Sequence, residues 1–139
     1  MNQQDLRVVV DLPGRDRIEA HKQNNIWKVV ASGCQELLES LRRLQATGED
    51  PSLWVLPNGN NHSDLLLREL ILKVRGEWVY PYQHEELCHC RSVATEIVDQ
   101  AILAGAHTTS SVSARTSAST ACGTCRPDVQ KILSYRLGS

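Results

Sequence analysis

Two close cysteine pairs decide how this 139-residue sequence is organised: Cys88-His89-Cys90 and Cys122-Gly123-Thr124-Cys125. In each pair, the short spacing lets the backbone turn around one metal centre, so that both thiolates face the same point. Gly123 allows the chain to come close to such a centre without a Cβ clash. Four thiolates together make a site for an iron–sulfur cluster or for zinc.

The fifth cysteine, Cys34, stands apart from both pairs. An odd number of cysteines without a secretion signal argues against a disulfide framework and favours metal or redox chemistry. The spacing leaves two competing interpretations open, a disulfide between Cys122 and Cys125 and a structural zinc site. The C-x-C spacing of the first pair is less usual for zinc than C-x₂₋₄-C, which places an iron–sulfur cluster ahead of zinc.

The sequence around the cysteine pairs, residues 83–139, predicts a domain built from helices only. Three helices are predicted, over residues 96–104, around Val112 and from Pro127 onward. Thr95 and Thr108 are candidate N-caps for the first two. This part of the chain has one aromatic residue, Tyr135. Because so small a segment seldom holds together by its core alone, we expect the cysteines to cross-link it through a metal.

Residues 1–82 predict a separate α+β domain. Its expected elements are strands over residues 6–12, 17–22 and 26–31, and helices over residues 33–46 and 63–75. Trp78, Tyr80 and Tyr82 alternate with other residues as an edge strand would. The fold class is therefore α+β: a small strand meander with two helices, followed by an all-α helix-turn-helix domain, with the boundary after residue 82.

Composition and charge exclude several classes of function. A formal net charge of −1 gives no electrostatic case for binding nucleic acid or an anionic membrane. No apolar run approaches the ~18 residues of a spanning helix, and the N-terminus lacks a signal-peptide pattern, so we expect a cytoplasmic protein. The sequence shows no Gly-rich phosphate loop, Ser–His–Asp order or paired catalytic carboxylates. We therefore expect no enzyme and no catalytic residues.

The stretch from Cys88 to Leu133 resembles the bacterioferritin-associated ferredoxin-like [2Fe–2S] domain. That family has C-x-C, a helix, a Gly-x-x-Thr turn, a second helix, a Thr- and Ala-rich approach, C-G-x-C and a final helix. The sequence supplies Cys-His-Cys-Arg-Ser-Val-Ala-Thr at residues 88–95, Gly-Ala-His-Thr at 105–108 and Thr-Ala-Cys-Gly-Thr-Cys at 120–125. The resemblance implies a helix-turn-helix around a [2Fe–2S] cluster, with Cys88, Cys90, Cys122 and Cys125 each giving one thiolate.

The first half shows a fainter resemblance, to the U-type iron–sulfur assembly scaffold. That family has a Gly-Cys pair opening one helix and an L-P-x-x-x-x-H-C-S run opening another; this sequence has Gly33-Cys34 and Leu-Pro-Asn-Gly-Asn-Asn-His-Ser at residues 56–63. Two of the three scaffold cysteines are missing. We therefore expect Cys34 to be a small buried residue at a helix start, and His62 to be a polar helix-entry residue, rather than ligands.

The leading functional hypothesis is a non-enzymatic [2Fe–2S] protein that transfers single electrons to or from a protein partner. The first alternative is an iron–sulfur cluster assembly or delivery protein, in which the front half binds a client or a sulfur donor. The second alternative is a zinc-stapled interaction module without a redox role. The expected partner of the iron–sulfur forms is a redox or iron–sulfur client protein, with neither nucleic acid nor a membrane involved.

Overall fold

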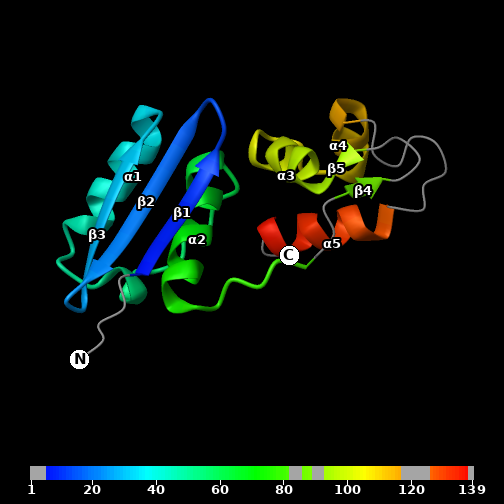
Figure 1. Cartoon of the computed structure of the whole chain (residues 1–139). Helices are drawn as coiled ribbons and strands as arrows, with labels where there is room; N and C mark the ends of the chain where they lie inside the picture. Colours follow the sequence, from blue (N-terminus) through cyan, green and yellow to red (C-terminus); the bar gives the residue numbers. More distant parts are fainter. Residues whose placement is uncertain (1–5, 82–85, 89–92, 117–125, 138–139) are drawn as a thin grey trace. The chain divides into compact units, whose positions relative to one another are not determined.

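The computed structural model describes residues 6–81, 86–88, 93–116 and 126–137. The chain divides into two compact units, Met1–Trp78 and Val79–Ser139. Figure 1 shows a sheet with helices in the N-terminal unit, and the described part of the C-terminal unit is mainly helical. The predicted α+β class, with a helical C-terminal part, is confirmed.

The N-terminal unit is built on an antiparallel sheet of three strands in the order β1-β2-β3. The strands span Leu6–Leu12 (β1), Asp16–Gln23 (β2) and Ile26–Ser32 (β3). Val10 of β1 lies opposite Ile18 of β2. Asn24 and Asn25 join β2 to β3, and both have positive φ angles, as a tight two-residue hairpin turn requires. The predicted strand meander is confirmed.

Two α-helices pack on one face of this sheet, as Figure 1 shows. They span Gln35–Gln45 (α1) and His62–Arg75 (α2), and a short 3₁₀ helix, Pro51–Leu53 (η1), lies between them in the chain. Both α-helices occur where the sequence predicts them. Alternate strand positions and the helix leucines form the core: Val10, Leu12, Ile18, Ala20, Leu37, Leu41, Leu66 and Leu70. The strands and helices therefore bury one face of the sheet and leave the other to solvent.

The opposite face of the sheet carries a group of charged side chains. The guanidinium groups of Arg7 and Arg17 both donate hydrogen bonds to Oε1 of Glu19. These hydrogen bonds, the one from Arg7 first, lower the pKa of Glu19 from its usual 4.5 to about 2. All three side chains are at least partly exposed, so the group adds little to stability at moderate salt.

The described residues of the C-terminal unit form the helices Thr95–Leu103 (α3), Thr109–Thr116 (α4) and Arg126–Leu137 (α5). Their shared core consists of aliphatic residues: Val93, Val98, Ile102, Ala106, Val112, Val129, Ile132 and Leu133. Thr108 caps α4 as predicted, because its Oγ1 accepts a hydrogen bond of 3.0 Å from the backbone N–H of Ser111. This unit therefore has an apolar core of its own.

Three local predictions were wrong. Two short antiparallel strands, Glu86–Cys88 (β4) and Val93–Ala94 (β5), precede α3, so the unit is not built from helices alone. Ala94, not Thr95, occupies the N-cap of α3, and its own side chain makes no capping hydrogen bond. The predicted edge strand fails over its described part, since residues 77–81 form no strand. Over the described ranges, none of the helices combines the length and apolar character that crossing a membrane requires.

Candidate metal centres

The first candidate centre is the cysteine quartet, which we define as Cys88, Cys90, Cys122 and Cys125. Cys88 is the last residue of β4, and its backbone lies opposite Val93 of β5, which leads directly into α3. α5 begins at Arg126, the residue after the last cysteine. The other three cysteines lie outside the described residues, so their predicted sharing of one metal group stays a prediction.

The surroundings of the quartet fit an anionic iron–sulfur group. Cys88 ends β4, β5 leads directly into α3, and α5 starts directly after the second pair in the sequence. The N-terminus of a helix offers free N–H groups and the positive end of the helix dipole, which favour nearby anionic thiolates. The exposed side chain of Arg126 adds a positive charge at the start of α5. Four sulfur donors are the ligand set that [2Fe–2S] clusters use.

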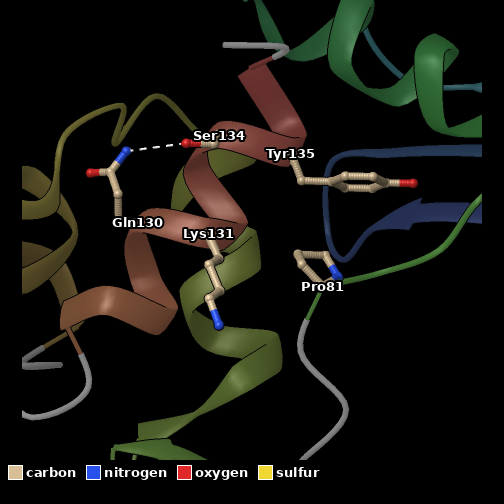
Figure 2. A pocket seen from close by; sticks show the side chains of 5 residues that line it. All are labelled: Pro81, Gln130, Lys131, Ser134 and Tyr135. Atoms are coloured by element: carbon tan, nitrogen blue, oxygen red, sulfur yellow. Dashed lines mark hydrogen bonds between the residues drawn. The ribbon is translucent and has the colours of Figure 1, made fainter.

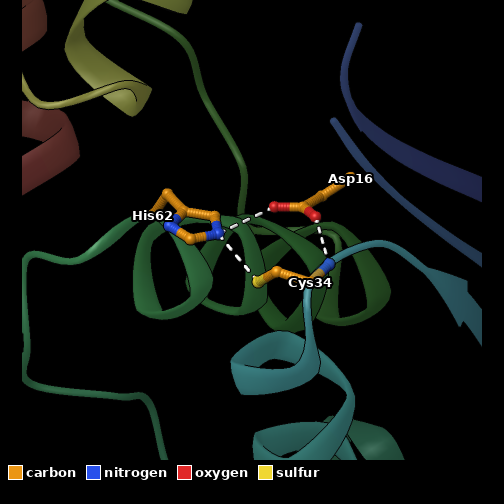
Figure 3. A group of neighbouring side chains, drawn as sticks. All are labelled: Asp16, Cys34 and His62. Carbon is orange, nitrogen blue, oxygen red and sulfur yellow. Dashed lines mark hydrogen bonds and ion pairs between the residues drawn. The ribbon is translucent and has the colours of Figure 1, made fainter. Parts of the chain in front are cut away.

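The second candidate centre lies in the N-terminal unit, where three elements bring Asp16, Cys34 and His62 together; we call these residues the N-terminal triad (Figure 3). Asp16 is the first residue of β2, Cys34 is the N-cap of α1, and His62 is the first residue of α2. One ligand atom from each residue lies within 4.8 Å of the other two. A carboxylate, a thiol and an imidazole from distant parts of the sequence therefore converge on one point.

The distances within the triad are those of close polar contact. His62 Nε2 lies 3.0 Å from Cys34 Sγ and 2.9 Å from Asp16 Oδ2. The other carboxylate oxygen, Asp16 Oδ1, accepts a hydrogen bond of 2.8 Å from the backbone N–H of Cys34. Cys34 Sγ also accepts a hydrogen bond from the backbone N–H of Leu37, which gives the sulfur its capping role. The hydroxyl of Ser63 lies 3.8 Å from the same sulfur.

The carboxylate of Asp16 is the unsatisfied member of this group. Asp16 is 3% exposed, and its buried Oδ2 has no hydrogen-bond partner within the part of the chain that the structure describes, although His62 Nε2 lies 2.9 Å from it. A single Nε2 can direct one proton at the sulfur or at the oxygen, but not at both. A buried carboxylate oxygen without a donor is costly, and a bound cation would satisfy it. Sulfur, imidazole nitrogen and carboxylate oxygen are together a donor set for zinc and for other divalent transition metals.

Two features of the local sequence fix the triad in place. Gly33 lies against Asp16 just before α1: a Cβ at this position would lie 2.0 Å from Asp16 Oδ1, so only glycine fits. The guanidinium of Arg68 donates hydrogen bonds to the carbonyl oxygens of Pro57 and Gly59, which holds the loop before His62 against α2. The donor atoms are therefore held by backbone geometry.

The structure corrects the expectation for Cys34 and extends that for His62. Cys34 is partly exposed at the helix start, not buried in the core, and its sulfur faces the histidine. His62 does open a helix as predicted, but its ring also reaches two possible metal ligands. Sequence reasoning missed Asp16. The sequence did hold one signal. In a strand, every second side chain faces the same way, so Asp16 shares the buried face with Ile18 and Ala20, where a carboxylate is rare.

Comparison with known protein families concerns the C-terminal unit. Residues 87–134 match the family described as BFD-like [2Fe-2S] binding domain, and the quartet lies inside this segment. The predicted resemblance and the predicted [2Fe–2S] cofactor are thereby confirmed. The match does not extend to the N-terminal unit and gives no support to its resemblance to the U-type scaffold. No curated protein and no solved structure matches the chain.

Proposed function

We propose, from the premise that residues 87–134 are a BFD-like [2Fe-2S] binding domain, that this chain is an iron–sulfur protein that passes single electrons to or from a protein partner. The observation that carries the proposal is that all four cysteines of the quartet lie inside the matched segment. A bound [2Fe–2S] cluster supplies a one-electron couple whose potential depends on hydrogen bonds to sulfur, net charge and solvent exposure.

Residues outside the quartet support this function by holding the C-terminal helices together and by placing positive charge next to the cysteines. The aliphatic core of α3, α4 and α5 holds together the helices that follow the two cysteine pairs. Arg126 places a positive charge directly after the last cysteine, where it favours the anionic form of the site. We further propose that the chain is not itself an enzyme, that its partner is a redox or iron–sulfur client protein, and that it works in the cytoplasm, where thiols stay reduced.

Visible absorption and electron paramagnetic resonance of anaerobically purified protein test this proposal. We expect about two iron atoms per chain, a visible spectrum, and a resonance signal after reduction. Cys122→Ser should remove the visible absorption, whereas Cys34→Ser, the matched control outside the quartet, should preserve it. A colourless protein that contains zinc would contradict the proposal and support the zinc-stapled interaction module.

A second function, iron–sulfur cluster assembly or delivery, is favoured by one observation, the N-terminal triad. With a single thiolate, this site suits one divalent metal ion as cargo, held by Asp16 Oδ2, Cys34 Sγ and His62 Nε2. The hydroxyl of Ser63 or a water molecule would supply a fourth ligand of the kind that zinc takes. A chain with such a site could receive metal in one unit and carry a cluster in the other.

Calorimetric titration of the cluster-loaded chain with Zn²⁺ tests the metal site. We expect one additional zinc ion per chain, with an affinity that falls at least ~10-fold in His62→Ala, because a ligand is lost. The matched control is His21→Ala, which removes an exposed imidazole from the other face of the sheet. Equal affinities of both variants would refute the site.

Cluster transfer separates the two functions. A delivery protein should convert an apo-ferredoxin to its holo form under reducing conditions, at a rate that exceeds spontaneous loss of the cluster. An electron carrier should keep its cluster through repeated reduction and oxidation in the same mixture. Retention without transfer would count against delivery.

A further inference from the structure

Asp99 in the middle of α3 accepts hydrogen bonds from two side chains that lie far away in the sequence. Arg136, in the last turn of α5, donates from Nε to Oδ1 at 2.8 Å and from Nη2 to Oδ2 at 2.6 Å. The hydroxyl of Tyr80, which precedes the first strand of the unit, donates to the same Oδ1 at 3.0 Å. We call Tyr80, Asp99 and Arg136 the Asp99 clasp.

The clasp is largely buried, and its arginine and carboxylate form two parallel hydrogen bonds. Arg136 is 4% exposed, and the carboxylate of Asp99 is mostly buried. The ring of Tyr80 packs against the aliphatic core of the unit. Two parallel N–H···O bonds between a guanidinium and a carboxylate form the strongest and most directional ion pair that side chains make, and low exposure protects it from salt.

Two of the three clasp residues lie outside the segment that matches the family. The match covers residues 87–134, so Tyr80 precedes it and Arg136 follows it. A second contact joins the same flanks, because the backbone N–H of Val79 donates to the hydroxyl oxygen of Tyr135 at 2.9 Å. Figure 2 shows Tyr135 and Pro81 from these flanks, which line an open hollow with three other residues of α5. The two flanks are therefore hydrogen-bonded to each other and to α3.

We propose that the Asp99 clasp holds α3 and α5 together independently of the cluster, so that the C-terminal unit stays folded when the cluster is absent and can take it up again without refolding. The inference rests on cluster binding by this unit, and it holds for electron transfer and for delivery. Small metal-binding domains commonly fold only with their metal, because their cores are too small. The clasp adds hydrogen bonds and an ion pair that link both flanks of the family segment to α3.

The order of the elements along the chain explains the effect of the clasp. α3 follows the first cysteine pair through β5, and α5 follows the second pair directly. A tie between the two helices limits how far apart the two pairs can move in the apo protein. Because the pairs then need little ordering before they bind, cluster insertion should be fast.

Hydrogen exchange measured by mass spectrometry on the full chain, with and without the cluster, tests the proposal. In apo wild type, peptides from α3 and α5 should stay protected. In apo Asp99→Asn, their exchange should be at least ~10-fold faster, since a hydrogen-bonded charge is lost, and cluster reconstitution should slow in parallel. Tyr80→Phe, which removes only a hydroxyl, should show the same effects to a smaller degree. Glu96→Gln, on the exposed side of α3, is the matched control and should behave as wild type.

A double-variant cycle identifies the ion pair as the cause. Asp99→Asn combined with Arg136→Gln should recover part of the protection, because the buried guanidinium that faced the lost carboxylate is removed as well. Effects that simply add would mean that the two residues act separately, and would overturn the clasp. Rapid exchange of α3 and α5 in apo wild type would overturn it as well. Iron content before chelation is measured on the same samples, so that a failure of cluster binding is told apart from a failure of the clasp.

Discussion

Gly33→Ala tests the geometry of the N-terminal triad directly. The Cβ of an alanine would lie 2.0 Å from Asp16 Oδ1, whereas real Cβ contacts stay beyond 3.0 Å, so the carboxylate must move by about 1 Å. That shift breaks the hydrogen bond from the backbone N–H of Cys34 to a buried charged group. Alanine is also strained at the φ of +148° that Gly33 adopts.

The expected cost of Gly33→Ala follows from these two effects. Loss of a hydrogen bond to a charged group costs about 1.5–3 kcal/mol, and an unfavourable φ costs about 1–3 kcal/mol. We therefore expect the free energy of unfolding to fall by about 2.5–6 kcal/mol. Zinc affinity should fall at least ~10-fold, because one ligand is displaced.

Urea unfolding followed by tryptophan fluorescence measures this change, since all three tryptophans lie in the N-terminal unit. Gly48→Ala is the matched control: its φ is +72° and nothing lies within 4 Å of the added Cβ, so it carries backbone strain of about 1–2 kcal/mol alone. Equal losses of stability in both variants, with unchanged zinc affinity in Gly33→Ala, would show that the triad does not depend on this contact.

Three further predictions concern the N-terminal unit. Asp16→Asn should lower zinc affinity ~10–100-fold yet raise the unfolding midpoint of the metal-free protein, because it removes a buried charge whose Oδ2 has no hydrogen-bond partner among the described residues; calorimetry and urea unfolding measure both. Ser63→Cys adds a second sulfur near Cys34, so a Co²⁺ titration of the cluster-loaded chain should show increased charge-transfer absorption and tighter binding; an unchanged spectrum would remove Ser63 as a ligand position. The pKa of Glu19 is lowered to about 2 by Arg7 and Arg17, so its contribution to stability should be complete above pH 4.5 and vanish as the pH falls toward 2. Unfolding of wild type and Glu19→Gln at low salt should therefore converge in that range, and a constant difference would contradict the assignment.

Regular elements of this fold could be predicted because they carry a periodic signal. The β-branched apolar run of β1, the alternation in β2 and the leucine spacing of α1 belong to elements of seven or more residues. β4 and β5 have three and two residues, which is too short for any period to show. Tyr80 alternates with its neighbours as a strand residue would, but its hydroxyl is used by Asp99, and no local rule reveals that contact.

The two candidate centres differ in how far the sequence could reveal them. The close spacing within each cysteine pair predicts the quartet from the sequence, and the family match confirms the cofactor. The N-terminal triad joins residues 16, 34 and 62, which meet only because β2, α1 and α2 begin at one end of the unit. Local patterns carry no information on such an encounter, so sequence reasoning missed Asp16 and predicted Cys34 to be a small buried residue at a helix start.

The donor chemistry of the two centres argues that they hold metal for different lengths of time. Four thiolates bind a soft, multinuclear group that is retained. One thiolate with an imidazole and a carboxylate binds a single ion through fewer strong bonds, and the side chain of His62 is 18% exposed, which gives the ion a way in and out. Zinc or ferrous iron should therefore leave the N-terminal triad under a mild chelator that does not bleach the cluster. If both metals were lost at the same rate, the two centres would share one role, and the case for metal delivery by the first unit would fail.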